Sequence, residues 1–186
     1  MKVLDTDLAE VKIIEPDVHE DERGFFYESF NLRDYEAALG PLPPFVQDNH
    51  ARSQRGVLRG LHCQLAPSEQ GKLVRVTAGC VYDVAVDIRP GSPDFGRWTG
   101  AELSAANRRQ MWIPPGHAHG FLVLSDYAET LYKVTAYYDP AAERVIDHAD
   151  PAIGIQWPLL PGVPITLSAK DRQGRALHHL QPGRAD

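Results

Sequence analysis

Short runs of alternating apolar and polar residues, separated by turn residues, recur along most of the chain. Gly and Pro number 15 each and are spread over the whole length, and the runs between them are rich in Val, Ile, Leu, Tyr and Phe. Many short strands with frequent turn signals are typical of an all-β sandwich or barrel. We expect strands within residues 11–14, 25–30, 45–50, 56–64, 73–76, 80–89, 98–103, 109–113, 121–124 and 129–138.

One short helix is expected among these strands. Asn31 can cap its first turn, residues 32–39 form it, and Gly40 with the proline-rich loop that follows ends it. The chain has 186 residues, which is the size of one compact domain. We therefore expect a single domain over residues 1–186, with a loosely ordered tail from about residue 178.

Composition narrows the class of protein. Hydrophobic residues make up 43% of the chain and charged residues 24%, as in ordinary soluble globular proteins. The net charge of −6 argues against nucleic acid as a partner, because such a surface needs a basic stripe. The two cysteines are expected to be free thiols in a reducing cytosol. We find neither a signal peptide nor an apolar run of membrane-spanning length, so we expect a soluble, cytoplasmic protein that does not bind membranes.

The stretch 56–64 carries the most reactive side chains. Arg59, His62 and Gln64 lie at polar positions of this strand-like run, and Lys72 begins the next apolar-alternating run. Arginine and lysine bind phosphate, and histidine moves protons. Two neighbouring strands here would bring an imidazole and an ammonium into one place, which favours a functional site.

Arg59 and His62 have opposite parity in an ideal strand. Gly60 lies between them, and a strand glycine can host a bulge that turns the chain. With a bulge, both side chains would face one cavity. Without it, Arg59 would line the cavity mouth or a neighbouring subunit's pocket.

A metal site is an alternative use of the histidines. His62, His117 and His119 lie at strand-like positions, and in a β-barrel of the jelly-roll or cupin type they can point into one cavity. Two histidines and a carboxylate are a common ligand set. However, the first motif of a metal cupin usually has a second histidine, which is absent here, and the nearby carboxylate, Glu69, lies in a loop. His117 alone is better explained as a polar residue at a strand end.

Other polar and aromatic residues indicate a phosphate-containing ligand with a planar ring. Tyr132 and Tyr138 would lie on one face of a strand about 20 Å apart, which suits an elongated ligand with a reacting end and an aromatic end. Phe26 and Tyr138 could stack on a planar base, although core packing is the simpler role for Phe26. The donors suited to phosphate oxygens are Arg23, Gln47, Asn49, Arg59 and Lys170.

Five motifs appear in order along the chain and resemble those of the dTDP-4-dehydrorhamnose 3,5-epimerase family. The resemblance covers about residues 3–177. The motifs are DERGFF (21–26), FVQDNH (45–50), GVLRGLH (56–62), QGKLVR (70–75) and WIPPGHAHGF (112–121).

The resemblance implies a cupin-type jelly-roll β-barrel with a few short helices, a homodimer, and no metal or organic cofactor. It also implies inversion of C3 and C5 of a dTDP-linked 4-keto-6-deoxy sugar on the route to dTDP-L-rhamnose. Exchange of N-terminal strands across the dimer would carry Arg23 and Phe26 into the other subunit's site.

The same resemblance assigns roles to single residues. His62 matches the general base and Tyr132 the general acid, while Lys72 matches the lysine at the C4 oxygen and Asp171 the carboxylate that orients the histidine. Tyr138 matches the aromatic that stacks on thymine. The nucleotide- or sugar-contacting positions are Arg23, Phe26, Glu28, Gln47, Asn49, Arg59, His119, Glu143 and Lys170.

Two stretches depart from the family pattern. Cys63 replaces an aromatic residue, and residues 145–148 lack the usual glycine and tryptophan. These departures leave open an epimerase that acts at C3 or C5 alone. A metal-dependent or non-enzymatic cupin is the alternative from a different class.

Overall fold

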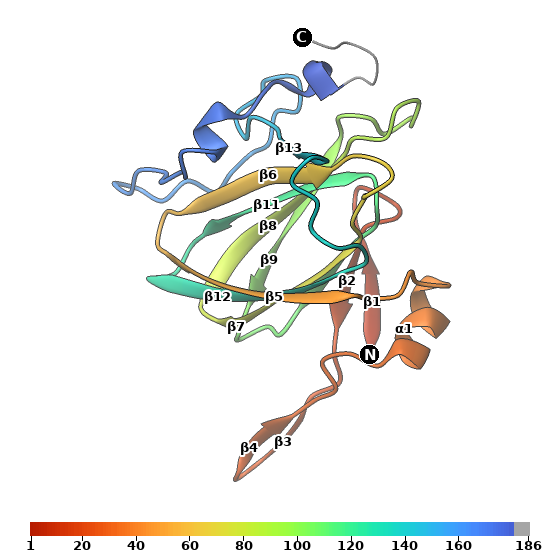
Figure 1. Ribbon diagram of the computed structural model, residues 1–186. Coiled ribbons are helices and arrows are strands. Elements are labelled where there is room, and N and C mark those ends of the chain that lie inside the picture. The colour runs from red at the N-terminus through yellow and green to blue at the C-terminus, as the bar shows by residue number, and fades with distance from the viewer. Residues whose placement is uncertain (181–186) are drawn as a thin grey trace.

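Two antiparallel β-sheets face each other in the computed structural model, which describes residues 1–180 (Figure 1). The first sheet has the order β1 (Lys2–Asp5), β2 (Lys12–Glu15), β10 (Gln110–Ile113), β7 (Lys72–Ala78), β12 (Tyr127–Val134) and β5 (Gln47–Gln54). The second has the order β13 (Glu143–Val145), β6 (Leu58–Gln64), β11 (His117–Val123), β8 (Cys80–Asp87) and β9 (Trp98–Ser104). This arrangement confirms the predicted all-β fold of the jelly-roll type.

The main core lies between the two sheets. Val74 and Val76 of β7 pack in one cluster with Val81 and Ala85 of β8 and Phe121 of β11. Val74 and Val76 are two residues apart and Val81 and Ala85 are four apart, and even spacings of this kind put side chains on one face of a strand. The period of two in the sequence therefore produces the sheet-to-sheet packing directly.

A second apolar cluster covers the outer face of the five-stranded sheet. Val84 and Val86 of β8 pack there against Ile146, Ile153 and Leu177 of the C-terminal segment, which lies along β6 and β13 in Figure 1. Strand β8 is thus buried on both faces. This explains why its sequence is almost continuously apolar.

Two predicted strands are shorter than the sequence indicated. The strand predicted at residues 129–138 ends at Val134, because Val134 pairs with the first residues of both neighbours, Gln47 of β5 and Lys72 of β7. Within residues 1–180, neither neighbouring strand extends beyond that pair, so the strand pairing of β12 ends there. The strand predicted at residues 25–30 is reduced to β4 (Gly24–Phe26), which pairs only with β3 (His19–Asp21).

The predicted helix is confirmed as α1 (Leu32–Leu39), and it packs through the buried Tyr35. Asn31 has the extended backbone of a helix cap, but its side chain does not bond to the helix end. Its amide donates to Glu28 instead. Gly40 ends the helix with φ 84°, a conformation that glycine adopts without strain.

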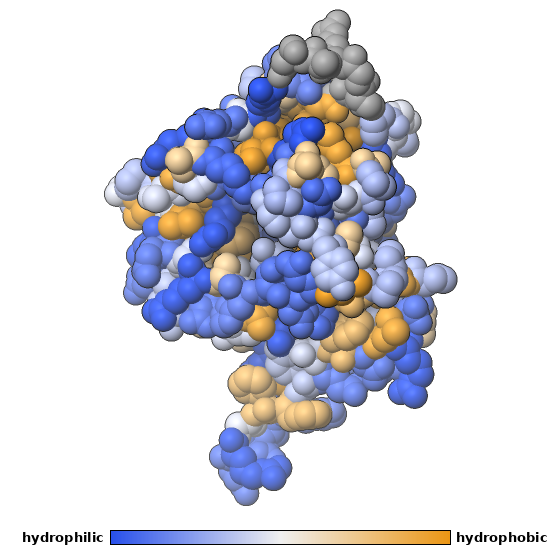
Figure 2. All heavy atoms as spheres, viewed as in Figure 1, coloured by the Kyte–Doolittle hydropathy of each residue, from blue (hydrophilic) through white to orange (hydrophobic). Residues whose placement is uncertain are grey.

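The hairpin β3–β4 projects from the body of the molecule (Figure 1). Phe25 and Phe26 are 60% and 67% exposed, and Figure 2 shows apolar side chains gathered between the hairpin tip and the body. Such exposed aromatic area on a short strand pair is unusual for a surface that meets only water.

The C-terminal part of the chain contains two single-turn 3-10 helices, η1 (Asp171–Gln173) and η2 (Leu177–Leu180). Residues 178–180, where we expected loose order to begin, belong to η2, and the rest of that tail lies outside the described residues. Within residues 1–180 we find no helix of the length and apolar character needed to cross a membrane.

Candidate active site

A cavity of about 370 Å³ lies between the two sheets. Strands β5, β7 and β12 of the six-stranded sheet contribute to its wall, and β6, β11 and β13 of the other sheet complete it. The predicted site residues that line it are Gln47, Asn49, Arg59, His62, Lys72, His119, Tyr132, Tyr138, Glu143 and Lys170.

A bulge in β6 brings Arg59 and His62 to the same cavity. His62 pairs with His119 of β11 and Arg59 pairs with Phe121, so three steps along β6 match two along β11. The extra residue falls at Gly60, whose φ is 115°. A Cβ atom there would lie 2.7 Å from the carbonyl oxygen of His119, so only glycine fits. The predicted bulge is confirmed, and Arg59 lines the cavity of its own chain.

His62 and Asp171 form a close pair. The His62 Nε2 atom lies 2.5 Å from Asp171 Oδ1, and Ser168 donates a hydrogen bond to Asp171 Oδ2 at 2.7 Å. Burial opposes ionisation of Asp171, but the hydrogen bonds from His62 and Ser168 outweigh it and lower the pKa of this carboxyl. An ionised Asp171 fixes Nε2 as the protonated nitrogen of His62, which leaves Nδ1 as the basic one.

Lys72 opens β7 and is 7% exposed. Its Nζ atom donates to the backbone oxygen of His62 at 3.4 Å, which places the ammonium beside the strand that carries the histidine. Burial lowers the pKa of Lys72 to about 8, although Cys63, Asp83 and Glu143 act in the opposite direction. At neutral pH the side chain is therefore still mainly protonated.

Tyr132 reaches the cavity from the sheet opposite His62. It lies on β12 and pairs with Asn49 of β5 and Val74 of β7, whereas His62 lies on β6. Burial raises the pKa of Tyr132, and the positive charges of Arg59 and Lys170 oppose this. The phenol is therefore neutral at physiological pH and can give up a proton.

Tyr138 lies at the cavity mouth. Its Oη atom donates to Glu143 Oε2 at 2.9 Å, Lys170 Nζ donates to Glu143 Oε1 at 2.7 Å, and the tyrosine is 52% exposed. The prediction that Tyr132 and Tyr138 share one strand face is wrong, because β12 ends at Val134. The chain bends at residues 135–136, directly after Val134, and both tyrosines line one cavity.

Sequence reasoning missed a second histidine–carboxylate pair. His119 Nε2 lies 2.8 Å from Asp83 Oδ1, and both side chains are buried. Burial lowers the pKa of His119, while Asp83 acts in the opposite direction. Asp83 lies between apolar residues of β8. A carboxylate at such a core position was the sequence feature that could have indicated this pair. The other lining residues that were not assigned to the site are Ala51, Cys63, Gln64, Gln70 and Phe121.

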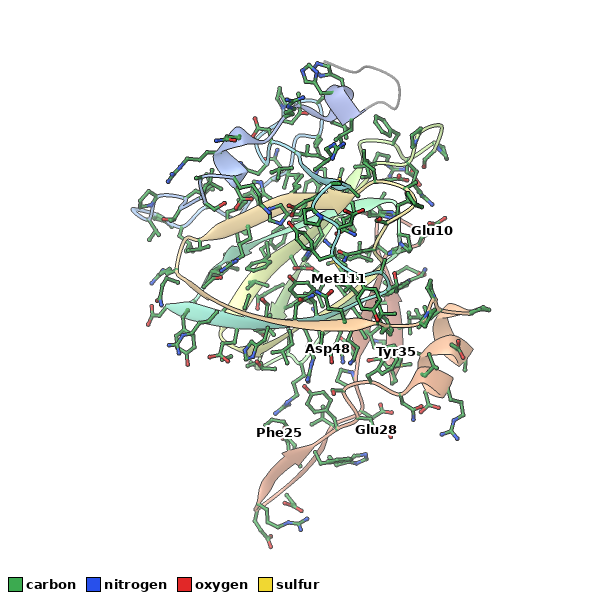
Figure 3. The ribbon with its side chains drawn as sticks, viewed as in Figure 1. Glu10, Phe25, Glu28, Tyr35, Asp48 and Met111 are labelled. Atoms are coloured by element: carbon green, nitrogen blue, oxygen red, sulfur yellow. The ribbon has the colours of Figure 1, made fainter. Side chains whose placement is uncertain are left out.

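Three predicted binding residues lie outside this cavity within one chain. Arg23 pairs with Asp21 at the hairpin, and Phe26 is 67% exposed on β4. Core packing, the simpler role considered for Phe26, is therefore wrong. Glu28 contacts Asn31 and lies with the labelled Phe25 on the hairpin side of the molecule (Figure 3).

Cys63 and His117 lie as the sequence indicated, the first as a free thiol and the second as a polar residue at the end of a strand. Cys63 contributes to the cavity wall while packing in the outer apolar cluster, and both cysteines are free thiols. His117 is buried at the start of β11, with Nδ1 3.2 Å from the Pro114 carbonyl oxygen. No group of three or more His, Cys, Asp or Glu residues in the described part of the chain is arranged to hold a metal ion.

Comparison with known proteins gives a consistent result. The sequence model described as dTDP-4-dehydrorhamnose 3,5-epimerase matches residues 5–179. The chain is 57% identical over 176 residues to the dTDP-4-dehydrorhamnose 3,5-epimerase of Pseudomonas aeruginosa, covering 95% of this chain and 96% of that protein.

Solved structures agree with the sequence comparison. A dTDP-6-deoxy-D-glucose-3,5-epimerase from Legionella pneumophila, in complex with dTDP-4-keto-L-rhamnose, is 53% identical with a TM-score of 0.93, covering 97% of this chain and 94% of that one. A 3'-monoepimerase from Streptomyces bikiniensis, in complex with dTDP-quinovose, is 34% identical with a TM-score of 0.87, covering 94% and 87%.

Proposed function

This chain belongs to the dTDP-4-dehydrorhamnose 3,5-epimerase family, and we propose how its cavity performs that reaction. The enzyme is an isomerase with a cupin-type fold. It inverts C3 and C5 of dTDP-4-dehydro-6-deoxy-D-glucose to give dTDP-4-dehydro-L-rhamnose, a step in dTDP-L-rhamnose biosynthesis. One observation carries the proposed mechanism: a histidine and a tyrosine enter one cavity from opposite sheets, with a buried lysine on its wall.

His62 is the general base. The hydrogens on C3 and C5 are acidic because both carbons neighbour the C4 ketone, and imidazole is the most frequent side-chain base in enzymes. Asp171, 2.5 Å from Nε2, holds the ring in one orientation and stabilises the imidazolium that forms. Both proton abstractions can use the same Nδ1 atom if the sugar ring presents C3 and C5 in turn.

Lys72 stabilises the enolate. Removing a proton next to the ketone places negative charge on the C4 oxygen, and a cation fixed in a poorly hydrated site stabilises that charge more strongly than water does. Lys72 is such a cation, because it is buried yet mainly protonated at neutral pH. Its contact with the backbone oxygen of His62 keeps the base and the cation in a fixed relation.

Tyr132 is the general acid. Inversion requires that the proton returns to the face opposite the one from which it left. Tyr132 lies on the six-stranded sheet and His62 on the five-stranded sheet, so the two groups meet opposite faces of a sugar ring held between them. A neutral phenol can donate this proton without competing as a base.

The nucleotide occupies the outer part of the same cavity. Arg59 and Lys170 supply positive charge for the diphosphate, and Gln47 and Asn49 supply amide donors. Tyr138, half exposed at the mouth, offers its ring to the thymine base. His119 and Glu143 complete the sugar-binding wall from the five-stranded sheet.

A monoepimerase is the second candidate. A 3'-monoepimerase shares the fold at a TM-score of 0.87 but only 34% identity, whereas a 3,5-epimerase structure shares 53%. The stronger likeness to the 3,5-epimerases favours inversion at both carbons.

Incubation with dTDP-4-keto-6-deoxyglucose in heavy water tests the function. We expect deuterium at both C3 and C5, and a product with the configuration of dTDP-4-dehydro-L-rhamnose by proton NMR. Deuterium at C3 or C5 alone would establish the monoepimerase. No uptake at either carbon by a folded protein would reject the proposed reaction.

We also propose that the enzyme acts as a homodimer in which the hairpin β3–β4 enters the partner's cavity. Three observations support this: the hairpin projects from the body (Figure 1), Phe26 is 67% exposed on it, and Arg23 and Glu28 lie outside the cavity of their own chain. In the partner's cavity Arg23 would meet the diphosphate, Phe26 would cover the base opposite Tyr138, and Glu28 would contact the ligand beside them. Light scattering should give twice the chain mass, and an active monomer would contradict the proposal.

A further inference from the structure

The segment that carries Tyr138 to the cavity mouth, residues 136–139, is spanned by one buried side chain. Gln64 donates from Nε2 to the backbone oxygen of Tyr137 at 3.2 Å. Its Oε1 atom accepts a hydrogen bond from the backbone nitrogen of Asp139 at 2.9 Å. A single amide therefore binds the backbone on both sides of Tyr138.

Two further glutamines bind the same segment. Gln70 Nε2 donates to the backbone oxygen of Ala136 at 2.8 Å. Gln47 Oε1 accepts a hydrogen bond from the backbone nitrogen of Tyr138 at 3.3 Å. Each residue of the Tyr138 segment thus has a backbone group bonded to a glutamine side chain, in the place where a neighbouring strand would supply partners.

Apolar packing holds this segment only weakly. Tyr137 and Tyr138 are 71% and 52% exposed, so their rings bury little area against the protein. Gln64, in contrast, is 6% exposed, and its amide also donates to the Ser68 backbone oxygen at 2.6 Å. A buried amide with its donors and acceptor satisfied is a rigid anchor, because leaving any of these groups unpaired in the interior destabilises the fold.

Gln64 also belongs to the strand of the general base. It follows His62 by two residues on β6, so both side chains project from the same face, and both line the cavity. The bulge lies before His62 and does not disturb this spacing. One short piece of strand therefore sets the position of the imidazole and, through Gln64, the position of the aromatic ring at the mouth.

We propose that Gln64 is a positioning residue for nucleotide recognition: it fixes Tyr138 at a set distance from His62, so that a base bound at the mouth places the sugar at the imidazole. The inference rests on the proposed function, in which Tyr138 receives the base. It adds a residue that acts through Tyr138 and through no contact of its own with the reacting carbons.

The test is a double-mutant cycle on dTDP affinity, measured by calorimetry. Tyr138→Ala should weaken binding by about 5- to 150-fold, the range for loss of one base–aromatic stack. Gln64→Met, which keeps the length of the side chain and removes the amide, should weaken it by about 10-fold. In the double variant, Gln64→Met should add almost nothing to the effect of Tyr138→Ala, because both act through one contact.

Turnover of the nucleotide sugar gives a second readout. For Gln64→Met the rise in KM should exceed the fall in kcat, because the ligand is held less well while His62, Lys72 and Tyr132 remain in place. Gln70→Met removes only the bond to the Ala136 oxygen and should show the same pattern more weakly. It serves as the test variant if Gln64→Met does not fold.

Val86→Ala is the matched control for loss of stability. Val86 is fully buried in the outer cluster, so its truncation lowers the melting temperature without touching the Tyr138 segment, and dTDP affinity should stay at the wild-type value. The inference is overturned if folded Gln64→Met and Gln70→Met bind dTDP like the wild type, or if the effects of Gln64→Met and Tyr138→Ala simply add. A wild-type protein that neither binds dTDP nor epimerises would instead reject the proposed function.

Discussion

At the scale of single residues, the proposed mechanism divides the chemistry among three side chains, and their separate removal should give three different results. In this proposal His62 takes the proton, Lys72 stabilises the charge that this creates, and Tyr132 returns a proton to the opposite face. The different surroundings of the three side chains support these roles. His62 has an ionised carboxylate at 2.5 Å, whereas burial lowers the pKa of Lys72 and raises that of Tyr132.

Replacing His62 by alanine should slow turnover by roughly 10²- to 10⁴-fold, the usual effect of losing a general base. Asp171→Asn should also slow it, because the imidazole loses the partner that orients it. Uptake of solvent deuterium into the sugar is the measurement, with circular dichroism to verify the fold. A near-normal rate of exchange in folded His62→Ala would assign the base to another residue.

Tyr132→Phe should separate exchange from inversion. His62 can still remove and return a proton on its own face, so deuterium should enter the sugar while inversion fails at the carbon that Tyr132 serves. Proton NMR of the product measures both events. If Tyr132 were only a half-buried strand aromatic, the variant would lose some stability and still invert both carbons, and such a product would remove Tyr132 from the mechanism.

Lys72 should make both activity and stability depend on pH. Its pKa in the folded protein is lowered to about 8, so turnover should fall as the pH rises through 8 and the enolate loses its cation. The unfolded chain holds this proton up to its ordinary, higher pKa. Between the two pKa values the unfolded state binds more protons, and this group therefore makes the folded protein more stable as the pH increases.

Lys72→Met should reveal the same effect at fixed pH. At pH 7 the variant should be more stable than the wild type by about 1–3 kcal/mol, since it no longer buries a charge, and this difference should disappear above pH 10.5. Its activity should fall by roughly 10²- to 10³-fold. Urea unfolding at pH 7 and pH 10.5 measures the stability. An equal or lower stability of the variant at pH 7 would show that the buried ammonium is well compensated.

At the scale of single elements, the bulge in β6 decides which side chains face the cavity. An ideal strand would send Arg59 and His62 to opposite faces, because side chains alternate with a period of two. The extra residue at Gly60 shifts this alternation by one position, so that the side chains of Arg59 and His62 face the same cavity. Close contact with β11 leaves no room for a side chain at this point, so the glycine is required on steric as well as conformational grounds.

Gly60→Ala tests this requirement. The new Cβ atom would lie 2.7 Å from both the Gly120 Cα atom and the His119 backbone oxygen, and these backbone atoms cannot rotate away. We expect a loss of stability of more than about 2 kcal/mol and a large loss of activity, measured by urea unfolding and by turnover. Gly91→Ala is the control, since Gly91 also has positive φ but no atom within 4 Å of the added Cβ. An equal effect at both positions would attribute the whole loss to φ strain.

At the scale of the whole molecule, one chain supplies all the residues proposed to transfer protons but leaves Arg23 and Phe26 on a hairpin outside its own cavity. If the hairpin serves the partner's site, then each active site is built from two chains. A dimer of two different inactive variants could then contain one complete active site.

Mixing two inactive variants tests this arrangement. In a mixed dimer of His62→Ala and Arg23→Ala, one cavity would have its own His62 and receive Arg23 from the partner, so activity should return when the two proteins are unfolded and refolded together. Two samples refolded separately and then combined are the control if exchange of subunits is slow. Failure to recover activity, with mixed dimers present by mass spectrometry, would place Arg23 in the site of its own chain or outside any site.

The sequence by itself determined the class of the fold and indicated most of the residues that line the cavity. Alternating apolar positions are a local property, and they indicated the strands because a sheet with one buried face must repeat every two residues. The motif around Gly60 and His62 is also local. Even its bulge could be expected, because Arg59 and His62 are an odd number of residues apart and would face opposite sides of a regular strand. These features depend on neighbours in the chain, which the sequence shows directly.

The tertiary structure decided what depends on distant partners. No local pattern joins Asp171 to His62 across 109 residues; the family resemblance implied this pair, and the structure shows the contact. Asp83 meets His119 only because β8 and β11 pair within one sheet. Strand β12 ends at Val134 because both neighbours begin there. The chain bends directly after it, and Tyr138 lines the same cavity as Tyr132. The alternation of apolar residues continues past that point in the sequence, but a strand exists only where another chain segment satisfies its hydrogen bonds.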